Sequence, residues 1–342
     1  MTDIARIRAA ARRVTPAVRR TPLLRAEALD RIAGRRVWVK AECLQITGSF
    51  KLRGAWSAVS ALDPVARARG VLAFSSGNHA QGVAYAARAH RAPAVIVMPR
   101  DAPAPKIANT RALGAEVVLY DRAGGQDREA LGAALAAERG STLIAPYDHP
   151  DVIAGQGTCG LELAAQAQAA GIARGEVLVC CGGGGLSAGI ALALAAEAPG
   201  LTARTCEPEG FDDVARSLAS GARQTNAARD GSICDAILTP SPGRLTFPIL
   251  QAHSGPGLVV SDDDCLRAMA LAFEHLKIVL EPGGAAGLAA ALFAGDRVSG
   301  GDVIAVATGG NVTGQMFARA LTMPENVSAP GHEVPGLASA RL

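Results

Sequence analysis

The sequence predicts an α/β fold made of two open parallel-sheet domains. Between residues 70 and 145, short runs of Val, Ile and Leu alternate with amphipathic stretches, and the alternation returns after residue 175. Continuous apolar strands separated by helices are typical of a parallel sheet that is covered on both faces. A chain of 342 residues with 49% hydrophobic composition is also long enough for about two compact domains.

The individual elements follow from these patterns. Ile4, Ile7 and Ala11 recur at helical spacing and predict an N-terminal surface helix, although this Arg-rich start also resembles an organellar presequence. In the first series we expect strands at 71–74, 94–98, 116–120 and 142–146, with helices at 80–90, 106–114 and 127–139. In the second series we expect strands at 177–181, 201–207 and 302–307, and a helix from Leu186. Gly and Pro clusters at 240–257 and 281–287 predict loops.

The two series predict how the chain is divided into domains. We expect a large cofactor-binding domain at 1–70 and 146–325, and a small substrate-binding domain at 71–145. Residues 326–342 are rich in Pro, Gly and Ser and are expected to form a frayed tail.

Composition argues against several functions. The net charge of +3 comes from interspersed residues and only 4% of residues are aromatic, so we expect no nucleic-acid binding. The longest apolar stretch, Leu186 to Ala196, is well short of the roughly 20 residues that span a bilayer, so we expect no membrane segment. The seven cysteines include no CxxC pair and predict reduced core residues of a cytoplasmic protein.

Lys51 is the first candidate for chemistry. The 34 Lys and Arg residues include only four lysines, Lys40, Lys51, Lys106 and Lys277, and Lys51 lies within the sequence GSFKLRGA. A lysine amine with a lowered pKa can attack a carbonyl, which arginine cannot do. We predict Ser49 as the N-cap and Lys51 in the first helical turn, where the helix dipole opposes protonation. The alternative is an ordinary solvated charge.

Four consecutive glycines, Gly182 to Gly185, follow an apolar strand and precede a helix. Such a loop can bind a phosphate group with its backbone N–H groups and the helix N-terminus. Two alternatives stay open at this point. In the first, the loop binds a dinucleotide: the pattern GxGxxA is matched by Gly183, Gly185 and Ala188, and Glu207 would be the acid that binds the ribose. In the second, the loop binds no ligand and only allows the helix to pack closely on the strand.

The sequence SSGNH at 75–79 places small hydrogen-bond donors at the start of a predicted helix. Ser75, Ser76 and Asn78, together with the free N–H groups of the first turn, suit a carboxylate. A simple N-capping turn would need only one of these residues. From its position alone, His79 is expected to be structural.

These motifs occur in an order and spacing that resemble a known family. The chain is similar to the fold-type II pyridoxal-phosphate enzymes, and specifically to the threonine/serine dehydratase and serine racemase branch, over roughly residues 4 to 320. The motifs that carry the likeness are GSFKLRGA, SSGNHAQG, AGQGT, GGGGLSAG, EPEGFDD and TGGN. The resemblance implies the tryptophan synthase β-like architecture and a pyridoxal 5'-phosphate cofactor, and it leaves the dinucleotide interpretation without a role for Lys51.

The resemblance also implies roles for the site residues. Lys51 would hold the pyridoxal aldehyde as a Schiff base, and the other cofactor-binding residues would be Phe50, Asn78, Gly182, Gly183, Gly184, Gly185, Leu186 and Thr308. The substrate carboxylate would be surrounded by Ser75, Ser76, Asn78 and His79. Thr308 would face the pyridine nitrogen as a neutral hydroxyl, where many relatives carry serine, and this favours elimination of a β-substituent. Ser76 would lie on the opposite face of Cα from Lys51, as a second acid/base that a racemase requires.

Three further residues form a candidate metal site. Glu207, the Phe211 carbonyl and Asp213 offer hard oxygen ligands suited to Mg²⁺, Mn²⁺ or Ca²⁺. From the residues alone, a solvated acidic turn is the simpler interpretation; the resemblance to metal-activated members favours an ion. Arg128 stands where relatives reach a distal substrate group, such as the second carboxylate of 3-hydroxyaspartate, although a surface helix residue is the simpler interpretation. Glu281 is expected to support the cofactor pocket or to cap a helix.

The sequence therefore predicts a cytoplasmic homodimeric dehydratase that converts a 3-hydroxy amino acid to a 2-oxo acid and ammonia. Serine, threonine and 3-hydroxyaspartate all remain open as substrates. The alternative enzyme is an amino-acid racemase. A non-catalytic pyridoxal-phosphate or amino-acid binding protein is a more distant alternative.

Overall fold

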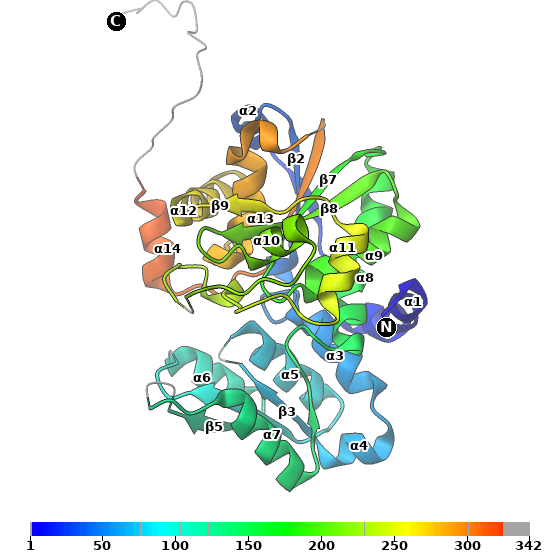
Figure 1. Cartoon of the computed structure of the whole chain (residues 1–342), viewed down its shortest axis with the longest axis vertical. Helices are drawn as coiled ribbons and strands as arrows, with labels where there is room; N and C mark the ends of the chain where they lie inside the picture. The colour runs from blue at the N-terminus through cyan, green and yellow to red at the C-terminus, as the bar shows by residue number, and fades with distance from the viewer. Residues whose placement is uncertain are drawn as a thin grey trace, which may run out of the picture.

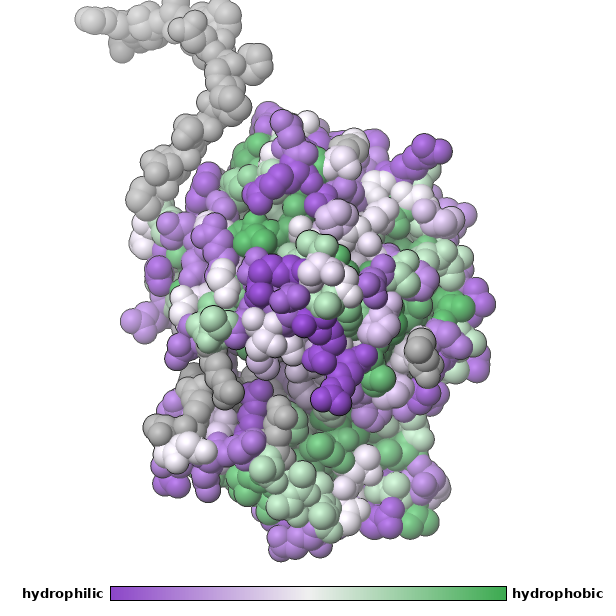
Figure 2. Space-filling model, viewed as in Figure 1, coloured by the Kyte–Doolittle hydropathy of each residue, from purple (hydrophilic) through white to green (hydrophobic). Residues whose placement is uncertain are grey.

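The computed structural model describes residues 2–323, except residues 76, 103, 122, 123, 229 and 300. Two α/β parts lie one above the other, and each has its own sheet (Figure 1). The predicted tail at 326–342 lies outside the described residues. Hydrophilic and hydrophobic residues are interspersed over the face drawn in Figure 2, and hydrophilic residues gather near the middle, where the two parts meet.

The larger sheet has six strands in the described residues, in the order β1-β2-β10-β7-β8-β9. They are β1 (Leu23–Arg25), β2 (Arg36–Lys40), β7 (Gly175–Cys180), β8 (Leu201–Pro208), β9 (Leu258–Val260) and β10 (Asp302–Val306). All neighbours pair in parallel except β1 with β2. Strand β10 lies between β2 and β7 and is buried along its whole length, as expected for an apolar strand in the middle of a sheet.

The smaller sheet has four parallel strands in the described residues, in the order β5-β4-β3-β6. They are β3 (Val71–Phe74), β4 (Ala94–Pro99), β5 (Glu116–Tyr120) and β6 (Thr142–Leu143). The helices between them are α5 (Asn78–Ala89), α6 (Ala104–Ala112) and α7 (Arg128–Arg139). The predicted alternation of strands and helices over this part of the chain is confirmed, and so is the parallel sheet.

Most of the remaining helices surround the larger sheet, whereas α4 (Pro64–Arg69) lies beside the smaller part (Figure 1). The others are α1 (Ile4–Val14), α2 (Glu27–Ala33), α3 (Lys51–Ala61), α8 (Pro150–Ala169), α9 (Gly185–Glu197), α10 (Asp213–Ser220), α11 (Thr246–His253), α12 (Asp262–Leu271), α13 (Pro282–Phe293) and α14 (Gly314–Leu321). A short 3₁₀ turn, η3 (Asp235–Ile237), precedes α11. The predicted N-terminal helix is α1, which buries Ile7, Ala10 and Val14.

Two segments that we predicted as loops contain helices. The cluster at 240–257 includes α11, and the cluster at 281–287 opens α13. Pro282 stands at the start of α13, where the missing N–H costs nothing. The glycines that suggested a loop allow close packing instead: a Cβ on Gly287 would lie 2.7 Å from the Leu178 carbonyl oxygen.

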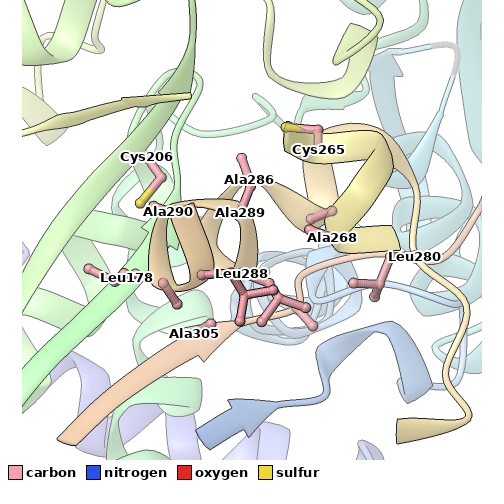
Figure 3. Close-up of a cluster of buried hydrophobic side chains, with 14 of the residues drawn as sticks. Leu178, Cys206, Cys265, Ala268, Leu280, Ala286, Leu288, Ala289, Ala290 and Ala305 are labelled. Atoms are coloured by element: carbon pink, nitrogen blue, oxygen red, sulfur yellow. The ribbon is translucent and has the colours of Figure 1, made fainter. Parts of the chain in front are cut away.

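Helix α13 lies in the main hydrophobic core. Its Ala286, Leu288, Ala289 and Ala290 pack among side chains from the sheet and from α12 (Figure 3). Cys206 and Cys265 also belong to this cluster, and all seven cysteines are free and buried, as predicted. Among the described residues, no helix is long and apolar enough to cross a membrane.

Helix α3 is shared between the two parts. Its Ala55, Ala58 and Val59 belong to the core beneath the smaller sheet. Arg53 points the other way, into a buried ion network of the larger part: it contacts Glu42 at 2.8 Å and Glu162 at 2.8 Å, and Lys40 contacts Glu162 at 2.7 Å. The first residue of this helix, Lys51, is therefore fixed by packing on both sides.

Candidate active site

A cavity of about 180 Å³ lies between the two sheets, at the ends of their strands. The predicted site residues that line it are Phe50, Lys51, Ser75, Asn78, His79, Arg128, Gly182, Gly183, Gly184, Gly185, Leu186 and Thr308. Segments far apart in the sequence thus meet in one place. Ser76 lies outside the described residues, although its neighbours Ser75 and Gly77 line the cavity.

Lys51 is the first residue of α3, and its amine is held inside the protein. Nζ donates a hydrogen bond to the Pro146 carbonyl oxygen at 3.0 Å. Burial lowers the pKa of Lys51 to about 8, against the opposing influence of Cys180 and Glu281. Roughly a fifth of the amine is therefore neutral near pH 7.4, far more than for an ordinary lysine, and this fraction can act as a nucleophile or base.

The predicted N-cap of this helix was wrong. Phe50, not Ser49, is the N-cap, and it makes no side-chain capping bond. The chain enters the helix from a bridge between Ser49 and Gly309, and the Ser49 hydroxyl is buried with no hydrogen-bond partner among the described residues. The Phe50 amide donates to the Thr308 carbonyl oxygen at 3.0 Å. These contacts hold the start of the lysine helix against the strand end that carries Thr308.

The glycine loop has the geometry of an anion cradle. It joins β7 to α9, with Gly184 in the left-handed region at φ 88°. Among the described residues, no group accepts a hydrogen bond from the backbone N–H groups of residues 183–187. The Gly183 carbonyl is fixed from behind, because it accepts from the Thr246 hydroxyl at 2.6 Å and from the Gly243 amide at 3.1 Å. The free amides and the N-terminus of α9 fit a phosphate group.

Tyr147 explains why this loop requires glycine. A Cβ on Gly183 would lie 2.2 Å from Cδ2 of the Tyr147 ring, and one on Gly185 would lie 3.0 Å from the Tyr147 Cα. No side chain fits in the first of these spaces.

Thr308 closes the cavity at the end of β10, where its side chain is buried. Its hydroxyl oxygen lies 2.9 Å from the Cys180 sulfur. Burial raises the pKa of the Cys180 thiol to about 12, so this group is a neutral thiol. A neutral thiol and a hydroxyl form a polar pair that carries no charge.

Asn78 is the centre of a short chain of buried polar groups. Its side-chain N–H donates to Glu281 Oε1 at 2.5 Å, and its Oδ1 accepts from Asn311 Nδ2 at 2.7 Å. Burial raises the pKa of Glu281 to about 7, and the bond from Asn78 acts in the opposite direction. An amide has two N–H donors, so Asn78 keeps one for a ligand in the cavity.

His79 is held in its neutral form. Its Nε2 contacts the Ile144 carbonyl oxygen at 2.8 Å and so carries the proton, and burial lowers the pKa of the ring to about 3. The other ring nitrogen, Nδ1, is buried without a partner. The ring therefore offers a lone pair and not a donor, whereas its backbone N–H lies in the open first turn of α5.

Three charged side chains from loops and helix starts surround the mouth of the cavity. Arg128 begins α7, and its guanidinium lies 5.7 Å from the centre of the Phe74 ring. Lys106 on α6 and Asp235 on η3 also line the cavity. Among the three, only Arg128 was predicted.

Of the predicted metal ligands, Glu207 lies near the end of β8, and Phe211 and Asp213 follow the strand. Both oxygens of Glu207 accept from backbone amides of α10, Val214 at 2.8 Å and Ala215 at 2.7 Å. Asp213 Oδ1 accepts from Asn226 at 2.6 Å, while its Oδ2 is buried without a partner. Burial raises the pKa of Glu207, and it raises that of Asp213 to about 6. Among the described residues, no group of three or more His, Cys, Asp or Glu side chains forms a metal site.

The lining residues that sequence reasoning missed include Lys106, Tyr147, Cys180 and Asp235. Cys180 ends an apolar run, which indicated only a core residue. Lys106 could have been found from the sequence, because lysine is scarce in this chain and each lysine is therefore a candidate functional residue. Tyr147 and Asp235 reach the cavity through tertiary packing, for which the local sequence has no pattern.

Comparison with known proteins agrees with this geometry. The family model described as "Pyridoxal-phosphate dependent enzyme" matches residues 14–309. L-threo-3-hydroxyaspartate ammonia-lyase of a Pseudomonas species is 43% identical over 91% of this chain and 96% of its own length. The crystal structure of a threonine deaminase from T.th. has a TM-score of 0.85 and 46% identity, over 91% of this chain and 99% of that one. Maize serine racemase has a TM-score of 0.85 and 36% identity, over 94% and 97%.

The chain belongs to the pyridoxal-phosphate dependent enzyme family. The predicted family and fold class are thereby confirmed, and so is pyridoxal phosphate as the cofactor of the family, whereas the comparisons do not support the predicted divalent metal. The dinucleotide interpretation of the glycine loop is not needed, because the same free amides fit the phosphate of pyridoxal phosphate.

Proposed function

We propose that this protein is an ammonia-lyase that converts a 3-hydroxy amino acid to a 2-oxo acid and ammonia. The observation that carries the proposal is the placement of one buried lysine of lowered pKa, Lys51, in the same cavity as a glycine cradle of free amides. The proposal is supported by the similarity to the Pseudomonas ammonia-lyase.

The residues present fit the cofactor. The amides of Gly183 to Leu186 would hold its phosphate, Lys51 its aldehyde carbon, Asn78 its phenolic oxygen and Thr308 its pyridine nitrogen. Phe50 lines the cavity beside Lys51, with its ring 5.2 Å from the amine. Bound pyridoxal phosphate would take up the electron pair left at Cα.

The chain's own residues would bind the substrate and move its proton. The N-terminus of α5 would bind the α-carboxylate through Ser75, Ser76 and the first-turn amides of Asn78 and His79. The lowered pKa of Lys51 suits its amine to remove the Cα proton, since a base works best when its pKa is near the working pH. The β-hydroxyl then takes up a proton and leaves as water, and the enamine that remains is released, tautomerises and is hydrolysed by a water molecule to the 2-oxo acid and ammonia.

The test is a panel of L-serine, L-threonine and both diastereomers of 3-hydroxyaspartate, assayed with pyridoxal phosphate for 2-oxo acid and for product enantiomer. Release of 2-oxo acid from any of them supports the proposal, and no oxo acid from all of them contradicts it. Lys51→Ala is expected to lose both the near-visible absorbance of the bound cofactor and turnover. Retention of both would remove Lys51 from the mechanism.

The second candidate is amino-acid racemisation, which the similarity to maize serine racemase favours. Racemisation needs a second acid/base on the face of Cα opposite Lys51, and Ser76 is our candidate. Inverted amino acid and exchange of the Cα proton with little oxo acid would establish this reaction in place of the elimination.

We also propose a divalent cation, Mg²⁺, Mn²⁺ or Ca²⁺, bound by Glu207, the Phe211 carbonyl and Asp213. The unpartnered Asp213 Oδ2 and the raised pKa values of both carboxyls fit such an ion, because a cation would neutralise two buried acids. It would stabilise the loop before α10 and not act at the bond being broken. Unchanged activity and melting temperature after chelation would contradict it.

The protein is proposed to work as a cytoplasmic homodimer of two-domain subunits, with domain boundaries near residues 70 and 146. Phe273, in the turn after α12, and Leu321, on α14, are exposed apolar side chains. Phe273 also packs edge-on against Phe317 of α14, with the ring centres 5.4 Å apart. Exposed apolar patches are typical of subunit interfaces. Sedimentation at equilibrium measures the assembly directly.

A further inference from the structure

The mouth of the cavity contains an ion pair that joins the two parts of the molecule. Lys106 Nζ lies 3.6 Å from Asp235 Oδ2. Lys106 belongs to α6, which packs on the smaller sheet, and Asp235 belongs to η3 of the larger part. Both side chains line the same cavity.

This pair is loosely held. The distance exceeds that of a charge-assisted hydrogen bond, and the side chain of Asp235 is 69% exposed, whereas that of Lys106 is only 21% exposed. An ion pair with one member largely in water contributes little to stability. A better-sheltered carboxylate inside the cavity would therefore displace Asp235 from the lysine at small cost.

The charges around the mouth favour such an anion. Among the described lining residues the cations are Lys51, Lys106 and Arg128, and the anions are Asp235 and Glu281. Glu281 accepts a hydrogen bond from Asn78 inside the cavity, away from the mouth. Lys51 would be bonded to the cofactor and so would not be available to a substrate carboxylate. Lys106 and Arg128 thus face Asp235 alone, and the mouth keeps a net positive charge.

We propose that Lys106 binds the distal carboxylate of a dicarboxylic substrate, and that Asp235 competes with this carboxylate for the lysine. The inference rests on the proposed function and narrows its substrate class to 3-hydroxy amino dicarboxylic acids. 3-Hydroxyaspartate is serine with a carboxylate in place of one Cβ hydrogen, so the two substrates differ by the one group that Lys106 would recognise.

The two cations of the mouth would have different tasks. Arg128 has its guanidinium over the Phe74 ring and is exposed. Lys106 is the more sheltered cation, and the Asp235 carboxylate already lies 3.6 Å from it. Lys106 would therefore contact the distal carboxylate directly, and Arg128 would attract the substrate through its positive charge without a direct contact.

The experiment compares Lys106→Gln and Asp235→Asn with wild-type holoenzyme, using L-threo-3-hydroxyaspartate and L-serine. Lys106→Gln should lower the ratio of kcat/KM for hydroxyaspartate over serine by roughly 10- to 100-fold, mainly through KM, because a charge-assisted contact is lost. Asp235→Asn should raise the same ratio a few-fold, because the competing anion is removed. The matched control is Arg111→Gln, which removes an exposed charge from the same helix and should leave the ratio unchanged.

Opposite shifts of the ratio in the two variants support the proposal. Equal losses for both substrates in both variants would make the pair a simple link between the two parts and overturn it, and so would an unchanged ratio in Lys106→Gln. Folding is checked by melting temperature and cofactor absorbance.

A binding measurement separates this inference from the proposed function. Succinate carries two carboxylates and butyrate one, and neither can react. Calorimetry should show tighter binding of succinate to the wild type and loss of that preference in Lys106→Gln. If the wild type shows this preference but releases no oxo acid from any substrate, the proposed lyase activity fails while the carboxylate subsite stands. If it shows no preference, the subsite fails whatever the turnover.

Discussion

The Cys180 sulfur lies 2.9 Å from the Thr308 hydroxyl oxygen, and both groups are buried in the wall of the cavity. Cys180 is the last residue of β7, and Thr308 lies just beyond the end of the neighbouring strand β10. Since the thiol stays neutral, it can donate its proton to the hydroxyl oxygen and leave the Thr308 proton free to point at a ligand.

We expect Cys180→Ala to destabilise the holoenzyme by about 1–2 kcal/mol, because the Thr308 hydroxyl loses a buried partner and a small void forms. The near-visible absorbance of the cofactor should also shift, since the hydroxyl is no longer oriented. Cys180→Ser keeps a donor and should restore the spectrum. Identical spectra and stability in all three proteins would show that the contact has no role.

The lowered pKa of Lys51 predicts a pH dependence of stability in cofactor-free protein. The pKa rises from about 8 in the folded state to its ordinary value of 10.5 on unfolding. Between these values the unfolded state binds more protons, so the free energy of unfolding should increase with pH, by roughly 3 kcal/mol across the window. Urea denaturation from pH 7.5 to 10.5 measures this increase. Lys51→Met should lack it; parallel curves for the two proteins would contradict the prediction.

The buried ion network predicts a large loss of stability when its centre is removed. Arg53 is fully buried and donates to both Glu42 and Glu162. Arg53→Met would leave these carboxylates with only Lys40 as a cation, and we expect a loss of roughly 3–5 kcal/mol. Thermal and urea denaturation provide the measurement. Arg139→Met, which breaks an exposed pair with Glu116, is the control and should cost less than about 1 kcal/mol.

The clash at the glycine loop predicts a specific loss of cofactor affinity. In Gly183→Ala the new Cβ would overlap the Tyr147 ring and force the loop away from its position. The dissociation constant for pyridoxal phosphate, measured by absorbance titration, should rise at least ~10-fold, because the amides no longer converge on the phosphate. Gly314→Ala, at the start of α14 with open space around it, should bind the cofactor as the wild type does. Equal affinities for both variants would exclude a tightly fitted cradle.

The sequence predicted those features that are encoded locally. Strand β3 is a continuous apolar run and β5 is one apart from its first residue, Glu116, and the predicted bounds 71–74 and 116–120 agree with the structure. The phosphate-binding loop and the reactive lysine were likewise predicted from residue type alone, because four consecutive glycines are unusual and lysine is scarce in this chain. Each of these signals comes from a short segment whose own chemistry limits what it can form.

The rest depends on contacts between distant segments. Helix α13 looks like a loop because its glycines and proline are poor helix formers, but the tight fit against β7 selects them. Ser49 looks like an N-cap, but it forms a bridge to Gly309 and its hydroxyl is buried with no partner among the described residues. The pair of Lys106 and Asp235 spans more than a hundred residues, and only the packed fold brings the two together.

Helix α3 couples the stability of one part to the chemistry of the cavity. The same helix supplies Ala55, Ala58 and Val59 to the core of the smaller sheet and presents Lys51 to the cavity. Its Arg53 is bound to Glu42 and Glu162 of the larger part, so the helix cannot turn with the smaller part without breaking a buried ion network. The base is thereby anchored to the same part of the molecule as the glycine loop, and the distance between the two groups is independent of small movements of the smaller sheet.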